Sequence, residues 1–157
     1  MKRAEKGMRP LDDRISYLNT DLELASLEDL SDLAAALDEC GMGIHYVGRA
    51  SQEWCANLDM DTGFGSPEQT IAAILGVVEA LPQHLEVAWN GCTRRELNIG
   101  YECGSEPSAF EQPLSNALLT RVVAAGASLV ITIYPNSPDA LPGRDDATID
   151  LPRKADT

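Results

Sequence analysis

The sequence predicts an α+β domain in which two β-α-β halves share one mixed sheet, with the helices on one face. Strand-like segments alternate apolar and polar residues, as expected for a sheet with one buried and one open face. Helix-like segments between them carry apolar residues at helical spacing. A weak internal repeat gives strand, helix, glycine and strand twice, as DLELAS–LEDLSDLAAALDECG–MGIHYV and RELNIGYECG–PLSNALLTRVVAAGA–SLVITIYP. This order is that of the split βαβ or ferredoxin-like plan, with an extra helix between the halves.

The first half of the chain predicts three strands and one helix. Residues 17–25 form the first strand, whose buried face carries Leu18, Thr20, Leu22 and Leu24. Ser26 then opens a helix through a variant capping box with Asp29, and Gly41 ends it. The helix buries a stripe that includes Leu27, Leu30, Leu33, Ala34 and Leu37. Residues 43–49 and 53–60 follow as a hairpin, with His45 on the face opposite Ile44 and Tyr46.

The second half predicts three helices and two strands. A helix begins at Ser66 as N-cap with Pro67 in its first position, and Pro82 ends or kinks it. A short helix continues to about residue 91 and is followed by a strand at 94–103. Another helix begins at Ser115 and ends at Gly126, and the last strand is 128–134.

The composition limits the classes of protein that remain. The chain has 157 residues, and its 12 Lys and Arg against 25 Asp and Glu give a net charge of −13. This length favours one domain, which we place at 15–135 between a flexible basic leader (1–14) and a disordered Pro/Asp-rich tail (136–157). The acidic surface argues against a nucleic-acid partner. Without an apolar run of membrane-spanning length or a signal peptide, we expect no membrane partner and a cytoplasmic location.

The acidic residues are concentrated in one part of the chain. Residues 15–90 hold 13 acids and one base, a net charge of −12. Within the first helical segment, Glu28, Asp32, Asp38 and Glu39 lie off the apolar stripe, and the last two stand at the end that the helix dipole disfavours. We predict that these four residues bind a basic protein partner. The alternative is that they form an ordinary solvated helix face.

Other motifs give weaker signals. Asp59-Met60-Asp61 places two carboxylates at a strand end, but no third ligand has a recognisable spacing. Gly63-Phe64-Gly65-Ser66 is interpreted as a turn and cap, because it lacks the lysine of a phosphate-binding loop. Cys40, Cys55, Cys92 and Cys103 form no close pair, so we expect free, mostly buried thiols. We predict no catalytic residue, metal ligand or cofactor, and whether Asp59 and Asp61 or the cysteines bind a metal stays open.

Residues 66–135 carry a resemblance to a known group. The order SPEQTIAAILGVVEAL, then RRELNIGY, then PLSNALLTRVVAAGASLVITIYP resembles small uncharacterised bacterial α+β domains. Some of these are candidate immunity proteins of polymorphic toxin systems. The resemblance implies a bacterial domain that binds a protein, and it carries over no functional residue.

The sequence therefore predicts a non-enzymatic, acidic protein-binding domain, with an immunity-type inhibitor of a basic toxin as its specific form. One alternative is a small-molecule-binding regulatory module, with a pocket or dimer seam near Tyr46, Trp89 or Tyr101. The other is an enzyme of unrecognised type, which requires polar groups that converge in a cleft. The strand order, the oligomeric state and the identity of the partner do not follow from the sequence.

Overall fold

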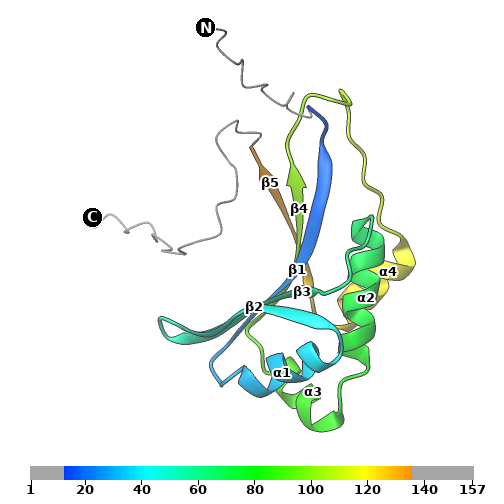
Figure 1. The fold of residues 1–157 in the computed structure, drawn as a ribbon. Coiled ribbons are helices and arrows are strands. Elements are labelled where there is room, and N and C mark those ends of the chain that lie inside the picture. Colours follow the sequence, from blue (N-terminus) through cyan, green and yellow to red (C-terminus); the bar gives the residue numbers. More distant parts are fainter. Residues whose placement is uncertain (1–12, 136–157) are drawn as a thin grey trace, which may run out of the picture.

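A computed structural model describes residues 13–135, which form four helices and one open, mixed sheet of five strands (Figure 1). The predicted α+β class is confirmed. The predicted tail and residues 1–12 of the predicted leader lie outside the described residues. In chain order the elements are β1 (Ser16–Ser26), α1 (Ser31–Glu39), β2 (Met42–Ala50), β3 (Glu53–Met60), α2 (Pro67–Glu79), α3 (Gln83–Asn90), β4 (Arg94–Glu102), α4 (Asn116–Ala124) and β5 (Ser128–Tyr134).

The strands lie in the order β2-β3-β1-β4-β5. β1 is central and runs antiparallel to both of its neighbours, β3 and β4. β2 is antiparallel to β3, so β1 and β2 run parallel to each other with β3 between them. β5 lies at the opposite edge and is parallel to β4, to which α4 connects it. The sheet is therefore antiparallel except at its β5 edge.

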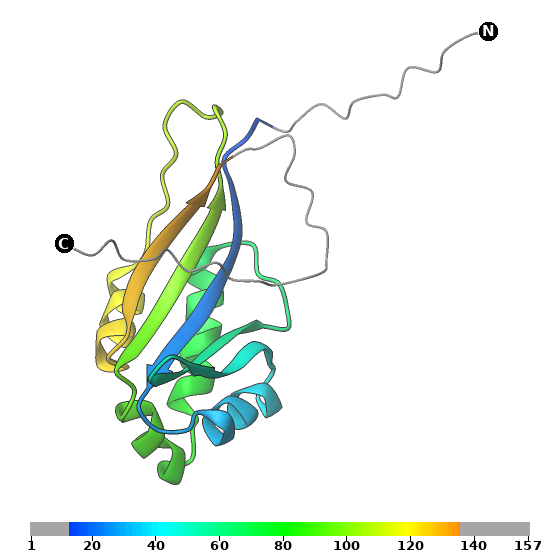
Figure 2. The ribbon, with the colours of Figure 1, turned by 90° about the vertical axis from the view of Figure 1, so that its left-hand side faces the viewer.

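The helices cover one face of this sheet and leave the other face open (Figure 2). Side chains from alternate strand positions, among them Leu22, Leu58 and Leu97, pack against Ile71 and Ile74 of α2 in a single buried cluster. Side chains at the intervening positions, such as Asp21, Asn57 and Asn98, face the open side. Burial of the apolar set provides the main driving force for folding and fixes the register, since a slip of one residue would exchange the two faces.

The predicted starts of α2 and α4 and the predicted ends of α1 and α4 are confirmed. The Ser66 hydroxyl accepts the N–H of Gln69, with Pro67 in the first turn of α2. The Ser115 hydroxyl accepts the N–H of Leu118 in the same way at the start of α4. Gly41 and Gly126 follow α1 and α4 with φ values of +97° and +65°, a backbone region that favours glycine.

The predicted start of α1 is wrong. Ser26 is still part of β1, where it pairs with Trp54, and the helix begins only at Ser31. The Ser26 hydroxyl accepts the N–H of Glu28 and so stabilises the connecting turn rather than the helix. Leu27, predicted on the buried stripe, is 66% exposed as a result.

Two irregularities in the strands overturn further details of the predicted faces. A register shift between Tyr17 and Asn19 leaves Leu18 47% exposed, although strict alternation places it in the core. A second shift, between Ile44 and Tyr46, pairs Tyr46 with Asn57. Tyr46 therefore lies on the open face with His45 and not with Ile44. An extra residue in one strand of an antiparallel pair changes the alternation beyond it, and periodicity alone does not reveal where it is inserted.

Among the helices of residues 13–135, no single one is long and apolar enough to span a membrane. α2 and α3 reach the required length and composition when taken together, across a bend of 120°.

Candidate functional site

Polar side chains line the middle of the open sheet face. Asn98 of β4 donates its amide N–H to Glu23 of β1 at 2.8 Å and accepts the hydroxyl of Thr132 of β5 at 2.7 Å. Asn19 donates to Oδ1 of Asp21 at 2.7 Å. These bonds connect three neighbouring strands on the side that the helices leave free, and they hold the Asp21 and Glu23 carboxylates in fixed positions.

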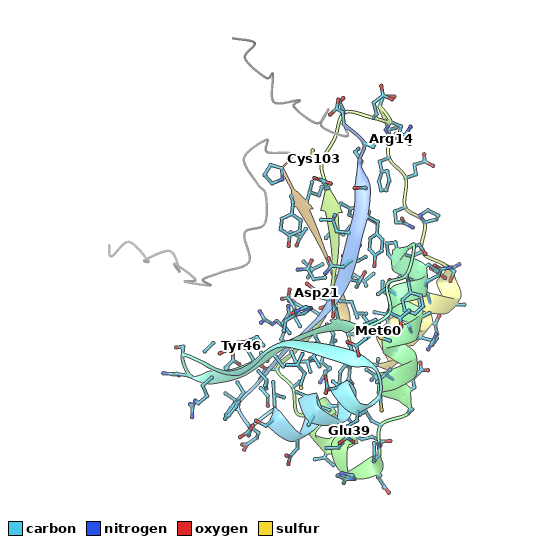
Figure 3. All side chains as sticks on the ribbon, in the orientation of Figure 1. Arg14, Asp21, Glu39, Tyr46, Met60 and Cys103 are labelled. Atoms are coloured by element: carbon cyan, nitrogen blue, oxygen red, sulfur yellow. The ribbon has the colours of Figure 1, made fainter. Side chains whose placement is uncertain are left out.

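Three of the strands bring metal-ligating side chains together at one point of this face. Asp21 of β1, His45 of β2 and Asp59 of β3 each place one potential ligand atom within 4.8 Å of the other two. Nε2 of His45 lies 3.0 Å from Oδ2 of Asp59. Figure 3 shows Asp21 near the point where β2 and β3 pass β1, on the side of the sheet away from α2. We call Asp21, His45 and Asp59 the triad.

The environment of Asp21 disfavours its charged form. Burial raises the pKa of the Asp21 carboxyl, and the nearby carboxylates of Asp59 and Glu23 raise it further. His45 and a hydrogen bond with Asn57 act in the opposite direction and lower it. The described residues include no lysine or arginine in an ion pair with Asp21 or Asp59. The triad is therefore a point of concentrated negative charge with little compensation by cations.

A third carboxylate, that of Asp61, lies close to Asp59 of the triad. A Cβ atom on Gly43 would stand 2.8 Å from Oδ1 of Asp61 and 3.4 Å from Oδ1 of Asp59. The missing side chain of Gly43 thus leaves room for both oxygens. Asp59 and Asp61 also line a cavity of about 290 Å³, together with Asn19 and the hydroxyl-bearing residues Thr20 and Thr70. The carboxylates therefore face an open space that water or a small ligand can enter.

The four predicted contact residues lie elsewhere. Glu28 is in the turn before α1, Asp32 is in the first turn of the helix, and Asp38 and Glu39 are in its last turn. All four are exposed, and none takes part in an ion pair with another described residue. Figure 3 shows Glu39 in the layer of helices, whereas Asp21 lies on the open face. The structure thus separates two acidic surfaces that the sequence does not distinguish.

A second cavity, largely apolar and of about 390 Å³, lies at the end of the sheet that α2 and α4 do not cover. Its walls include Tyr101, Phe110 and Leu114, with Ile131 and Ile133 of the edge strand. The rings of Tyr101 and Phe110 meet edge to face with centroids 5.3 Å apart. Ile131 and Ile133 are 65% and 64% exposed, so the cavity is open along β5. It lies at Tyr101, one of the positions considered for a small-molecule pocket.

The remaining motifs are not brought together into a site. The Gly63–Ser66 segment is a loop that ends in the N-cap of α2, and Gly63 and Phe64 line the 290 Å³ cavity. All four cysteines are free, and burial raises the pKa of the Cys92 thiol. The expectation of mostly buried thiols is wrong, because Cys40 is exposed beyond α1 and Cys55 and Cys103 are half-buried. Within residues 13–135, the triad is the one group of three or more His, Cys, Asp or Glu that can hold a metal ion.

Sequence reasoning considered Asp59 and His45 separately and did not single out Asp21. The signal that connects them is the register: Leu22 pairs with Leu58, so Asp21 and Asp59 lie on the same face of adjacent strands. Comparison of the chain with known protein families, with curated proteins and with solved structures finds no match.

Proposed function

We propose that this chain is a non-enzymatic, acidic domain that binds a cationic protein, and that Glu28, Asp32, Asp38 and Glu39 form the contact surface. The observation that carries the proposal is that these four exposed carboxylates have no ion-pair partner among the described residues. Asp38 and Glu39 also stand at the C-terminal end of α1, where the helix dipole disfavours negative charge. Charge that costs stability and finds no partner within the domain is suited to steering a cationic partner.

Asp32 and Glu39 are seven residues apart, so they lie on the same side of α1, two turns from each other. Glu28 extends the charge into the preceding turn. The surface is therefore an elongated strip, which suits a partner that carries several cationic side chains.

The resemblance of residues 66–135 to candidate immunity proteins supports the more specific form, an inhibitor of a basic toxin. We also propose that β1 to β4 follow the split βαβ, ferredoxin-like plan, since β3 lies between the parallel strands β1 and β2. In that description α4 and β5 extend the plan at the β4 edge.

The test compares two charge reversals of equal size. Asp38→Lys/Glu39→Lys changes the α1 surface, and Glu102→Lys/Glu111→Lys makes the same change in net charge at exposed positions at the end of β4 and in the loop before α4. The protein encoded by the neighbouring gene is the partner to test first, by stopped-flow association at several salt concentrations. The α1 variant should associate at least about tenfold more slowly than the control and show a weaker dependence on salt. Equal association rates for the two variants would refute the assignment of the surface.

A second candidate function, small-molecule binding, is favoured by the cavity beside Tyr101. Its volume of about 390 Å³ and its apolar walls are within the range of ligand pockets. A thermal-shift screen with apolar metabolites, run on the wild type and on Ile131→Arg, tests it. A compound that stabilises the wild type but not the variant supports the pocket, and silence across the panel counts against it.

A further inference from the structure

We propose that Asp21, His45 and Asp59 form a binding site for one divalent ion of the first transition series, with Zn²⁺ as the reference ion. This site is separate from the surface on α1, and the proposal does not depend on the proposed function. Three observations carry it: the convergence of the ligands, the way the strands hold them, and the open space beside them.

The distances suit one ion. Nitrogen and oxygen ligands stand about 2.0–2.2 Å from Zn²⁺, so two ligands of a tetrahedral site are about 3.4 Å apart. The ligand atoms of the triad already lie within 4.8 Å of one another. Small rotations of the exposed His45 ring and of the carboxylates bring the ligand atoms from these separations to the distance that a bound ion requires. The ligands come from three adjacent strands of one sheet, so the backbone that holds them is rigid.

Irregularities and neighbouring residues of the strands orient the three ligand side chains. His45 is the extra residue at the register shift of β2, so it has no direct cross-strand pair and its side chain turns toward Asp59. Such bulges often redirect a side chain next to a functional site. Asn19 donates to Asp21 at 2.7 Å, which fixes that carboxylate as outer-shell partners of metal ligands do. Gly43 leaves the space in which Oδ1 of Asp59 and Oδ1 of Asp61 lie.

A cavity adjoins the site at Asp59. Asp59 is shared between the triad and the 290 Å³ cavity, and Asp61 and Asn19 line the same space. An ion held by three protein ligands keeps at least one further coordination position, and the exposure of His45 leaves the site open to water or to a small anion.

The donor set favours one class of ion. An imidazole nitrogen with two carboxylates suits Zn²⁺, Co²⁺, Mn²⁺ or Ni²⁺, whereas Mg²⁺ and Ca²⁺ prefer sites built from oxygen alone. The four free cysteines are a competing source of ligands for Zn²⁺. Cobalt distinguishes the two, because thiolate ligands give intense charge-transfer bands and a site of nitrogen and oxygen does not.

The experiment titrates the full chain with Co²⁺ and with Zn²⁺, followed by absorption and by calorimetry. We expect one ion per chain, without thiolate bands, and weak competition by Mg²⁺ or Ca²⁺. His45→Gln and Asp59→Asn should each weaken binding by at least about tenfold. The matched controls His84→Gln and Asp38→Asn change exposed residues of the same type that are not part of the triad, and they should bind as the wild type does.

Imidazole ¹⁵N spectra give an independent measurement. The signals of His45 should shift on addition of Zn²⁺ and those of His84 should not. Because His45 is 56% exposed, His45→Gln is expected to leave the fold intact, which circular dichroism verifies. No saturable binding up to millimolar ion, thiolate bands with Co²⁺, or unchanged affinity in His45→Gln would each overturn the proposal.

Discussion

Arg95 should be the charged side chain whose removal destabilises the domain most. It projects from β4 toward the helices and donates hydrogen bonds to four backbone carbonyls. Nη1 contacts the carbonyl oxygens of Trp89 (2.8 Å), Cys92 (3.1 Å) and Asn90 (3.3 Å), and Nε contacts that of Gly126 (2.9 Å). Arg95 thus joins the C-terminal ends of α3 and α4 to the sheet by donating to carbonyls at and just beyond these ends, where intrahelical donors run out.

The expected loss of stability can be worked out from these contacts. A hydrogen bond of this kind contributes about 0.5–1.5 kcal/mol net, and one Nη1 with two protons cannot satisfy three acceptors fully. Two to three effective bonds, together with the cation–π contact to Trp89, give about 3 kcal/mol for Arg95→Ala. For a chain of this size the melting temperature should fall by about 6–12 °C.

Arg94 is the matched control, because it is the neighbouring residue on the opposite face. Its Nε lies 3.7 Å from Oε2 of Glu96, and both side chains are partly exposed, so Arg94→Ala should cost less than about 0.5 kcal/mol. Urea unfolding monitored by tryptophan fluorescence measures both variants. If the loss in free energy of unfolding for Arg95→Ala is within about 0.5 kcal/mol of that for Arg94→Ala, the inference that Arg95 anchors both helices to the sheet is wrong.

Three further predictions test the local structure. Ser66→Ala removes the N-cap of α2 and should lower the free energy of unfolding by about 0.5–2 kcal/mol in urea titrations. Gly41→Ala should lower the free energy of unfolding by about 1–2 kcal/mol, because φ at this position is +97°. Gly76 lies in the middle of α2 with open space around it, so Gly76→Ala should raise the free energy of unfolding by about 0.5–1 kcal/mol. Hydrogen bonds from Ser115 lower the pKa of the Glu68 carboxyl, so their contribution to stability is present above its ordinary pKa and is lost as the pH falls through the folded value. In Ser115→Ala, NMR titration should find the pKa of Glu68 raised toward its ordinary value.

The features that were predicted correctly are those set by local chemistry. Ser66 and Ser115 cap their helices, and Gly41 and Gly126 end theirs, because the residues involved are neighbours in the chain. The last strand, 128–134, was also placed correctly from its alternation. By contrast, Ser26 has the chemistry of a cap but belongs to β1, because pairing with Trp54 outweighs its local preference.

The triad could not be predicted from the sequence, because it too depends on contacts between residues far apart in the chain. Asp21, His45 and Asp59 meet because β3 inserts between β1 and β2 and because Leu22 pairs with Leu58. Neither the strand order nor the register is encoded in a short motif. The bulge at His45 adds a further displacement that periodicity does not reveal. The Asp59-Met60-Asp61 motif indicated the end of β3, where Asp59 of the triad lies. The other two residues of the triad, Asp21 and His45, lie far from it in the sequence.

The two proposed sites use different acidic residues of the domain, so each site can be tested without changing the other. A divalent ion at the triad would compensate Asp21 and Asp59 on the open face, but it would leave Glu28, Asp32, Asp38 and Glu39 around α1 unchanged. The association rate of a cationic partner at α1 should therefore change little on binding of Zn²⁺ at physiological salt, since the two sets of charges lie on opposite faces of the sheet and salt screens exposed charges. A strong effect of Zn²⁺ on association, abolished by His45→Gln, would instead mean that the partner contacts the open face and that the contact surface was assigned to the wrong side of the sheet.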